Sequence, residues 1–325
     1  MCPETLTLPL ETRNPPRWVT PFAKFLAVGT FCVVVAGGAV TSTRSGLADL
    51  HWPSFEGNLL PSPSEMMADR GKFYEHGHRM LAGTMVALTW VFALSLWKVR
   101  DPRLWLRRLS LAAGVVGLIP VLLGGLTVLR LTPPGVSIIH VLAAALFLSF
   151  NTSLAVVTGR RWVSASAELG DNHPRMTSEE SSWLRNAAIF CTLAVYLQIF
   201  FGAVLRQTNQ GDVLHILWAF AVFTGIVLLS ARVLGRHWEL AGLLRPGMAL
   251  LSLVVVQFLL GVMAYMVRPG EAKAPGSGLY EVVASSHQAL GDLLLAASVV
   301  LSLRVLRLRH LLESSREPGP AWGAA

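Results

Sequence analysis

The chain has 325 residues, of which 53% are hydrophobic and only 14% are charged. Soluble proteins carry about 25% charged residues on average, so this composition excludes an ordinary water-soluble enzyme. The apolar content also excludes disorder, and three cysteines are too few to hold a disulfide scaffold of this length together. The composition therefore predicts a polytopic membrane protein, and the formal net charge of +8 has to be explained within that class.

Eight segments are apolar enough and long enough to cross a membrane, for which a helix needs about 20 residues. The first of them has no small-residue cleavage site after it, so we expect a retained helix and not a signal peptide. In chain order the expected spans are residues 24–43, 78–97, 109–129, 136–157, 186–205, 213–233, 246–267 and 283–303.

Lysine and arginine gather in the N-terminal segment, in the loops after the second, fourth and sixth spans, and in the C-terminal tail. Because cytoplasmic loops are rich in these residues, we expect both termini to be cytoplasmic. The basic character then reflects membrane topology and anionic lipid, and no nucleic-acid partner is expected. An Arg- and Ser-rich transit segment is not seen, which favours a bacterial inner membrane.

A pair of helices is repeated four times along the chain. Each odd span carries glycine near its outer end, then an arginine near the membrane exit, and each even span carries a histidine near its start. The glycines are Gly37–Gly38, Gly124, Gly202 and Gly261, the arginines Arg44, Arg130, Arg206 and Arg268, and the histidines His78, His140, His215 and His287.

Two such pairs make a four-helix unit, and an even number of spans gives both units the same orientation. The expected fold is an all-α membrane protein of two four-helix bundles related by a pseudo-twofold axis. Residues 1–160 form the N-terminal half, residues 161–185 a cytoplasmic linker and residues 186–325 the C-terminal half.

The four histidines are expected at similar depth near the outer face, and an ionisable residue inside a membrane helix is a functional candidate by default. Four positions after each histidine stands a small residue, and positions i and i+4 share a helix face. An imidazole beside a flat open patch suits a planar macrocycle, whereas a tetrahedral metal site usually also draws in Cys or carboxylates. The pattern favours heme with imidazole ligation, and ordinary small-residue packing is the alternative. The small residues are Ala82, Ala144, Ala219 and Gly291.

The arginines at the helix exits suit heme propionates, since a guanidinium pairs well with carboxylates. Arg79, directly after His78, joins them as a candidate cofactor-binding residue. The alternative is that these side chains extend to the membrane interface without a ligand.

The first outer segment ends in Glu75-His76-Gly77-His78-Arg79. Glu75 lies three residues before His78, so a helix would put both on one side. There the carboxylate could act as a base, hold a water or stabilise positive charge, or simply favour the helix dipole. At i+2, His76 cannot share the face of His78, and we expect it to face solvent. The strong acid makes the first half the expected reaction site.

The run Gly38-Ala-Val-Thr-Ser-Thr-Arg44-Ser-Gly46-Leu47, then Trp52-Pro53, then Glu75-x-x-His78-Arg79, resembles the first half of the heme A synthase family. The resemblance implies an enzyme of eight membrane helices that oxidises the C8 methyl of heme O to a formyl group, giving heme A for terminal oxidases. It also implies contact with a heme O-making farnesyltransferase or with terminal oxidase assembly.

The same resemblance implies roles for individual residues. His78 and His140 would hold the substrate heme O in the N-terminal half, and His215 and His287 would hold a heme b in the C-terminal half. Glu75 matches the acid proposed to act in the oxidation. One departure is Pro120, which stands where the later repeats carry Gln198 and Gln257, so we expect a bend there.

Two other functions use the same histidines. An electron-transfer cytochrome, such as a quinol or ferric reductase with paired hemes, would contain only heme b and has no need of Glu75. A heme-handling assembly protein would bind heme O and return it unchanged.

Overall fold

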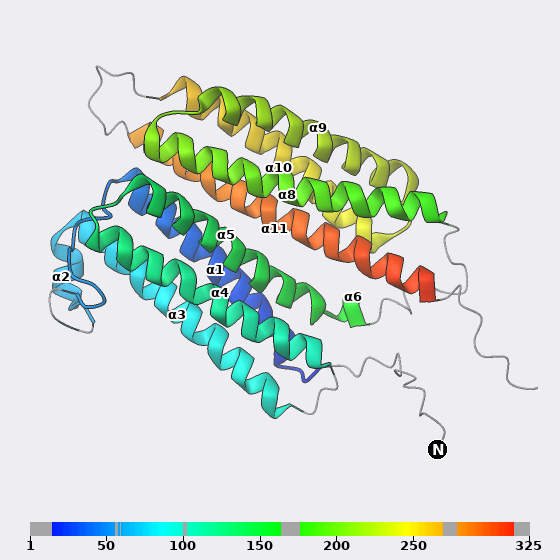
Figure 1. Ribbon diagram of the computed structural model, residues 1–325, viewed down its shortest axis with the longest axis horizontal. Helices are drawn as coiled ribbons and strands as arrows, with labels where there is room; N and C mark the ends of the chain where they lie inside the picture. The colour runs from blue at the N-terminus through cyan, green and yellow to red at the C-terminus, as the bar shows by residue number, and fades with distance from the viewer. Residues whose placement is uncertain are drawn as a thin grey trace, which may run out of the picture.

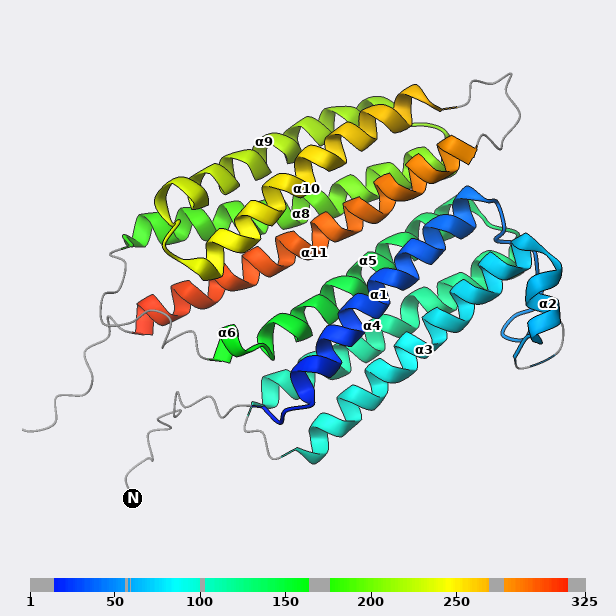
Figure 2. The same cartoon turned by 180° about the vertical axis from the view of Figure 1, so that it is seen from behind.

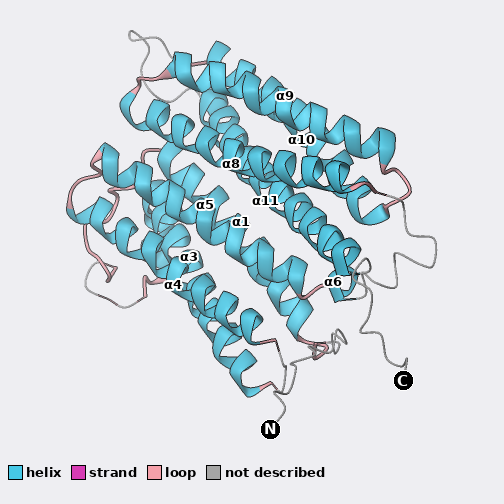
Figure 3. Cartoon of the chain, turned by 45° about the vertical axis from the view of Figure 1, so that its right-hand side comes forward, coloured by secondary structure: helices cyan, strands magenta, loops and turns pink. Residues whose placement is uncertain are grey.

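The computed structural model describes residues 15–55, 58, 60–99, 103–163, 176–268 and 278–314. Within these residues the chain is helical and has no strand beyond one isolated bridge between Phe55 and Asn58 (Figure 3). Eight helices of the described part are long and apolar enough to cross a membrane. The predicted all-α polytopic fold is confirmed.

Each expected span coincides with one long helix. In the N-terminal part these are α1 (Val19–Ser42), α3 (Arg70–Lys98), α4 (Leu104–Leu129) and α5 (Pro134–Val157), with short α2 (Pro63–Ala68) and α6 (Arg160–Val163) beside them. In the C-terminal part they are α8 (Ser178–Thr208), α9 (Asp212–Arg236), α10 (Ala241–Met266) and α11 (Gly278–Ser314).

Helix α3 begins eight residues before its expected start, because Asp69 caps it by accepting hydrogen bonds from the backbone N–H groups of Gly71 and Lys72. The early start places Glu75 and His78 well inside the helix. Pro120 lies within α4, which continues as one helix from Leu104 to Leu129.

The long helices form two groups of four that lie side by side (Figures 1 and 2). Helices α1, α3, α4 and α5 pack on one another, as do α8, α9, α10 and α11. Contacts of α1 and α5 with α11, and of α5 with α8, join the groups. Residues 164–175 of the expected linker lie outside the described residues, and the pseudo-twofold relation stays a prediction.

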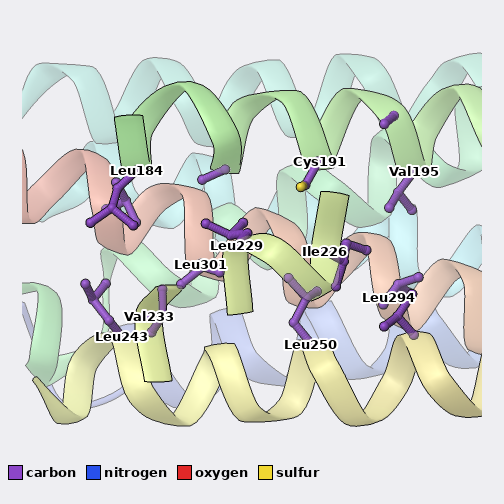
Figure 4. Close-up of a cluster of buried hydrophobic side chains, with 14 of the residues drawn as sticks. Leu184, Cys191, Val195, Ile226, Leu229, Val233, Leu243, Leu250, Leu294 and Leu301 are labelled. Atoms are coloured by element: carbon purple, nitrogen blue, oxygen red, sulfur yellow. The ribbon is translucent and has the colours of Figure 1, made fainter. Parts of the chain in front are cut away.

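Each group has its own apolar core. In the C-terminal group, leucines, isoleucine and valines from all four helices meet in the interior (Figure 4). In the N-terminal group, Leu26, Phe92 and Leu154 are fully buried, and Phe92 packs edge-on against Phe22 at 5.4 Å between ring centroids. Many large apolar side chains remain exposed on the outside of the helices, as expected for a surface that faces lipid.

A few polar side chains join helices inside the bundle. Asn151 of α5 donates to Thr30 of α1 at 2.9 Å, and the Thr192 and Ser302 hydroxyls of α8 and α11 are 2.8 Å apart. Such bonds fix the register of neighbouring helices, although each contributes only about 0.6 kcal/mol on average in a membrane protein. Apolar packing therefore carries most of the stability of each group.

We expect Leu148→Ala to destabilise the protein by about 2–5 kcal/mol, because it opens a cavity in the interior. The control is Leu146→Ala in the same helix: Leu148 is 1% exposed and Leu146 is 36% exposed. Denaturation of the purified protein in detergent, followed by circular dichroism, measures the difference. Equal losses for the two variants would contradict the assigned core.

Candidate functional site

Each of the four predicted histidines lies against a glycine of the preceding long helix. A Cβ atom built on the glycine would come within about 3 Å of the imidazole Cε1, closer than an ordinary van der Waals contact. The pairs are Gly37 with His78 at 2.9 Å, Gly124 with His140 at 3.2 Å, Gly202 with His215 at 3.1 Å, and Gly261 with His287 at 3.0 Å. The glycines and histidines of the sequence repeat thus form one repeated contact.

In the N-terminal half, the Nδ1 atom of each histidine faces a backbone carbonyl. His78 Nδ1 lies 3.1 Å from the oxygen of Val33, and His140 Nδ1 lies 2.9 Å from the oxygen of Pro120. A carbonyl can only accept, so Nδ1 carries the proton and Nε2 keeps its lone pair. Metal-binding histidines are commonly oriented in this way.

The two glutamines of the repeat reach the histidines of the C-terminal half. Gln198 Nε2 lies 3.2 Å from His215 Nδ1 and donates to the His215 backbone oxygen at 3.0 Å. Gln257 Nε2 lies 3.5 Å from His287 Nε2. Among the described residues, His287 Nδ1 and the Oε1 atoms of both glutamines are buried without a hydrogen-bond partner. Unpaired buried polar atoms are rare in native proteins, and here these atoms are available to bond a ligand.

A cavity of about 450 Å³ opens between the helices of the C-terminal group. Both histidines line it, and so do Ala219 and Gly291, the small residues one turn further along. Its volume falls within the roughly 300–1,000 Å³ of ligand pockets. Thr41 reaches it from α1, so the cavity extends to the boundary between the two halves.

The C-terminal histidines are spaced as a shared metal requires. The centroids of the His215 and His287 rings are 6.2 Å apart, and the ring planes cross at 78°. A metal midway would be about 3 Å from each centroid, which agrees with a bond of about 2 Å to an imidazole nitrogen. No group of three or more His, Cys, Asp or Glu able to hold a metal occurs within the described residues. These side chains fit a porphyrin iron held by two imidazoles.

His78 and His140 also lie near each other, close enough to interact electrostatically. The first loop (residues 43–69, described at 43–55, 58 and 60–69, with α2) lies at this end of the N-terminal group (Figure 2). Its Trp52 ring packs so closely against Gly125 that a Cβ built there would collide with the indole. Gly125 follows the glycine that contacts His140 along α4, so the loop packs on the same turn of that helix.

The structure separates the arginines of the repeat. Arg206 and Arg268 line the C-terminal cavity. Arg206 donates to Gln288 Oε1 at 2.6 Å and to the Gly38 oxygen at 3.3 Å, and so connects α8 with α11 and α1. Arg268 donates to Asn209. Both arginines stand where a ligand carboxylate in the cavity could reach them.

Arg44 and Arg130 are exposed. Arg44 lines a separate polar cleft with Asp69, Arg70 and Glu281. The arginines at the exits of α1 and α4 are therefore not part of the C-terminal cavity, and their contact with propionates stays a prediction.

Glu75 is buried in a network that ties the first loop to α3. It is 3% exposed and accepts a hydrogen bond from the backbone N–H of Asp49 at 2.8 Å. Arg79 donates to Glu75, and also to the backbone oxygens of Asp49 and His51, each at 2.8 Å. The Arg79 guanidinium is thus engaged within the protein, and its contact with a heme stays a prediction.

The expectation that His76 faces solvent is wrong. His76 is 1% exposed and its Nε2 lies 3.1 Å from a carboxylate oxygen of Asp49. Because α3 begins at Arg70, His76 lies within the helix. The first loop folds over the helix face that carries His76 and shields it from water. Phe55 of the same loop packs edge-on against the imidazole at 4.8 Å between ring centroids.

Asp49 is the central residue that the sequence reasoning missed. Its Oδ1 accepts from the backbone N–H of His51 at 2.9 Å and lies 2.8 Å from the His51 ring. Burial opposes its ionisation, but the hydrogen bonds from His51 and His76 outweigh it and hold the pKa of Asp49 below its usual range. Aspartate side chains in loops often accept a hydrogen bond from the backbone N–H two residues further on, which makes an Asx turn. That tendency is the sequence signal that could have identified Asp49.

Comparisons with known proteins find a family model and several curated relatives that match part of the chain. A family model described as cytochrome oxidase assembly protein matches residues 21–214, more than half of the chain. A heme A synthase of Brucella anthropi is 27% identical over 141 residues, which are 41% of this chain and 39% of that protein. A heme A synthase of Methylobacterium sp. is 28% identical over 149 residues, 43% of this chain and 41% of that protein. The alignments thus span about two fifths of these relatives.

The fold and the paired histidines define a multi-pass helical membrane protein with candidate heme sites. With the family match, the chain belongs to the heme A synthase family of cytochrome oxidase assembly proteins. The matched residues include Glu75, His78 and His140 and end just before His215. The assignment of His215 and His287 therefore depends on the geometry described above.

We expect Arg79→Met to destabilise the first loop by about 3–5 kcal/mol, because it leaves the buried Glu75 carboxylate without its counter-charge. Faster limited proteolysis within residues 43–69 measures the effect. Arg130→Met, which removes an exposed arginine, should leave the cleavage rate unchanged. Equal cleavage of both variants would show that the Arg79 bonds do not hold the loop.

Proposed function

We propose that this protein is a heme A synthase, which oxidises the C8 methyl group of heme O to a formyl group. The observation that carries the proposal is the repeated contact of four histidines with four glycines, together with the cavity that His215 and His287 line. The proposal also agrees with the family match. The heme A product serves terminal oxidases, with a heme O-making farnesyltransferase and oxidase assembly as candidate partners.

In this proposal His78 and His140 hold the substrate heme O, and His215 and His287 hold a heme b. A bound heme supplies one-electron chemistry at its iron. The chain supplies orientation, because the Val33 and Pro120 carbonyls fix the N-terminal imidazoles. It also supplies a mainly apolar cavity, whose lining residues Arg206 and Arg268 could bind the propionates of the heme b.

Glu75 belongs to the oxidation half of the proposal. In each of two steps an external oxidant takes two electrons from the methyl carbon and one C–H bond is replaced by C–OH, giving an alcohol and then a hydrated aldehyde, which loses water to give the formyl group. Each oxidation releases protons, and a carboxylate one turn from an iron ligand could accept one of them. Arg79 and the Asp49 N–H hold the Glu75 carboxylate in place. The Glu75 carboxylate is therefore held in one position and is not free to swing between positions.

The proposed orientation places both termini in the cytoplasm and the histidines toward the outer side of a bacterial inner membrane. The distribution of Lys and Arg between the loops supports it. The heme O substrate would enter from the lipid, where the exposed apolar side chains of the helices accommodate its farnesyl tail.

We expect His287→Ala to remove the C-terminal heme, because the variant loses one of two iron ligands. The Soret absorbance per polypeptide should fall by about half, as implied by two hemes each with two imidazoles. His310→Ala is the matched control, since His310 lies exposed on the same helix. An unchanged heme content in the His287→Ala protein would contradict the assignment.

Glu75→Gln tests the catalytic role while keeping a hydrogen-bond acceptor for the Asp49 N–H. In a host that makes heme O, we expect heme A to fall about 100-fold or more if Glu75 acts as a base, with heme O accumulating. Glu239→Gln, at an exposed acid between α9 and α10, is the control.

Chromatography of the extracted hemes measures both variants and the parent. Undiminished heme A in the Glu75→Gln protein would remove Glu75 from the mechanism. If the parent protein yields only heme b, it is an electron-transfer cytochrome, and if it returns heme O unchanged, it is a heme-handling protein. Either result would overturn the proposed function.

A further inference from the structure

Asp292 is a buried acid that the proposed reaction does not use. It lies on α11, is 1% exposed and lines the C-terminal cavity. Both of its carboxylate oxygens lack a hydrogen-bond partner among the described residues. An ionisable side chain at membrane depth is costly without a partner, and it is therefore a functional candidate.

The acid belongs to one of the four repeats. Asp292 stands five residues after His287, and the corresponding residues after His78, His140 and His215 are Gly83, Ala145 and Phe220. If this position served only helix packing, as in the other three repeats, an acid would not be needed at Asp292. The site next to His287 therefore has a property that the other three lack.

No described cation neutralises Asp292. The helices packed against α11 are α1, α5, α8 and α10. From α8, Arg206 directs its guanidinium to Gln288, Ser42 and Gly38, and after α10 Arg268 bonds Asn209. The other titratable groups of the cavity are His215, His287, Tyr265 and Tyr280, while α1 and α5 contribute Thr41 and Val141. No ion pair joins Asp292 to any of these groups.

We propose that Asp292 takes up a proton when the heme of the C-terminal cavity is reduced. This inference rests on the proposed function only in requiring a heme between His215 and His287. A ferric porphyrin carries one net positive charge, which is the counter-charge that a carboxylate in this enclosure lacks. Reduction removes that charge, and the carboxylate then binds a proton because an unpaired buried charge is unfavourable.

The step balances in charge and atoms. One electron from an external reductant converts ferric to ferrous iron, and one proton from water forms an O–H bond on an Asp292 carboxylate oxygen. The net charge of the cavity stays the same. Asp292 does not need to touch the iron ligand for this, since charges in an apolar enclosure interact over longer distances than in water.

The test is a redox titration of the purified, heme-loaded full chain with dithionite, followed by absorbance over several pH units. The C-terminal heme is identified by the band that His287→Ala removes. Its midpoint potential should fall as pH rises, toward 59 mV per pH unit for one proton and one electron. In Asp292→Asn the dependence should fall to less than half of that in the parent.

Asp212→Asn is the matched control, because it removes an acid from the same half that lies outside the cavity, and its potential should follow the parent. A parent potential independent of pH, or an unchanged dependence in Asp292→Asn, would overturn the inference. If Asp292→Asn fails to bind heme, Asp292→Glu decides: a retained dependence supports the role, and a lost one overturns it. A parent protein without any heme would instead overturn the proposed function.

Discussion

The approach of an imidazole to a glycine of the preceding helix is the constraint on which the site depends. A Cβ at Gly37, Gly202 or Gly261 would lie about 3 Å from the imidazole Cε1, so no larger residue fits without moving the ring. The contact fixes which face of each histidine-bearing helix, α3, α5, α9 and α11, turns inward. The small residues one turn further along then border the same space, as Ala219 and Gly291 do at the cavity.

The two halves use this shared contact differently. In the N-terminal half a buried network of Asp49, Glu75, His76 and Arg79 fastens the first loop to α3. In the C-terminal half the histidines open onto a cavity, with glutamine amides beside them. These differences are the basis for proposing the reaction in the half with the anchored carboxylate and a redox group in the half with the cavity.

Much of this was predictable from the sequence, because the length of each apolar segment and the fourfold repeat of glycine, arginine and histidine can be read directly from it. They identified the eight spans and the histidines, and the contact of each histidine with its glycine gives the repeat its physical meaning. The burial of His76 was not predictable from helix periodicity, since it depends on how a distant loop folds. The same holds for Asp49, whose partners His76 and Arg79 lie 27 and 30 residues away along the chain.

The arginines illustrate the limit of a repeat argument. Sequence position makes Arg44, Arg130, Arg206 and Arg268 equivalent, yet their partners differ, and Arg206 is hydrogen-bonded across the boundary between the halves. There it donates to the oxygen of Gly38, beside the glycine that contacts His78, and to Gln288, beside His287. One partly buried guanidinium thus contacts the neighbours of one histidine in each half. A shift of one histidine site relative to the other would therefore break hydrogen bonds of Arg206.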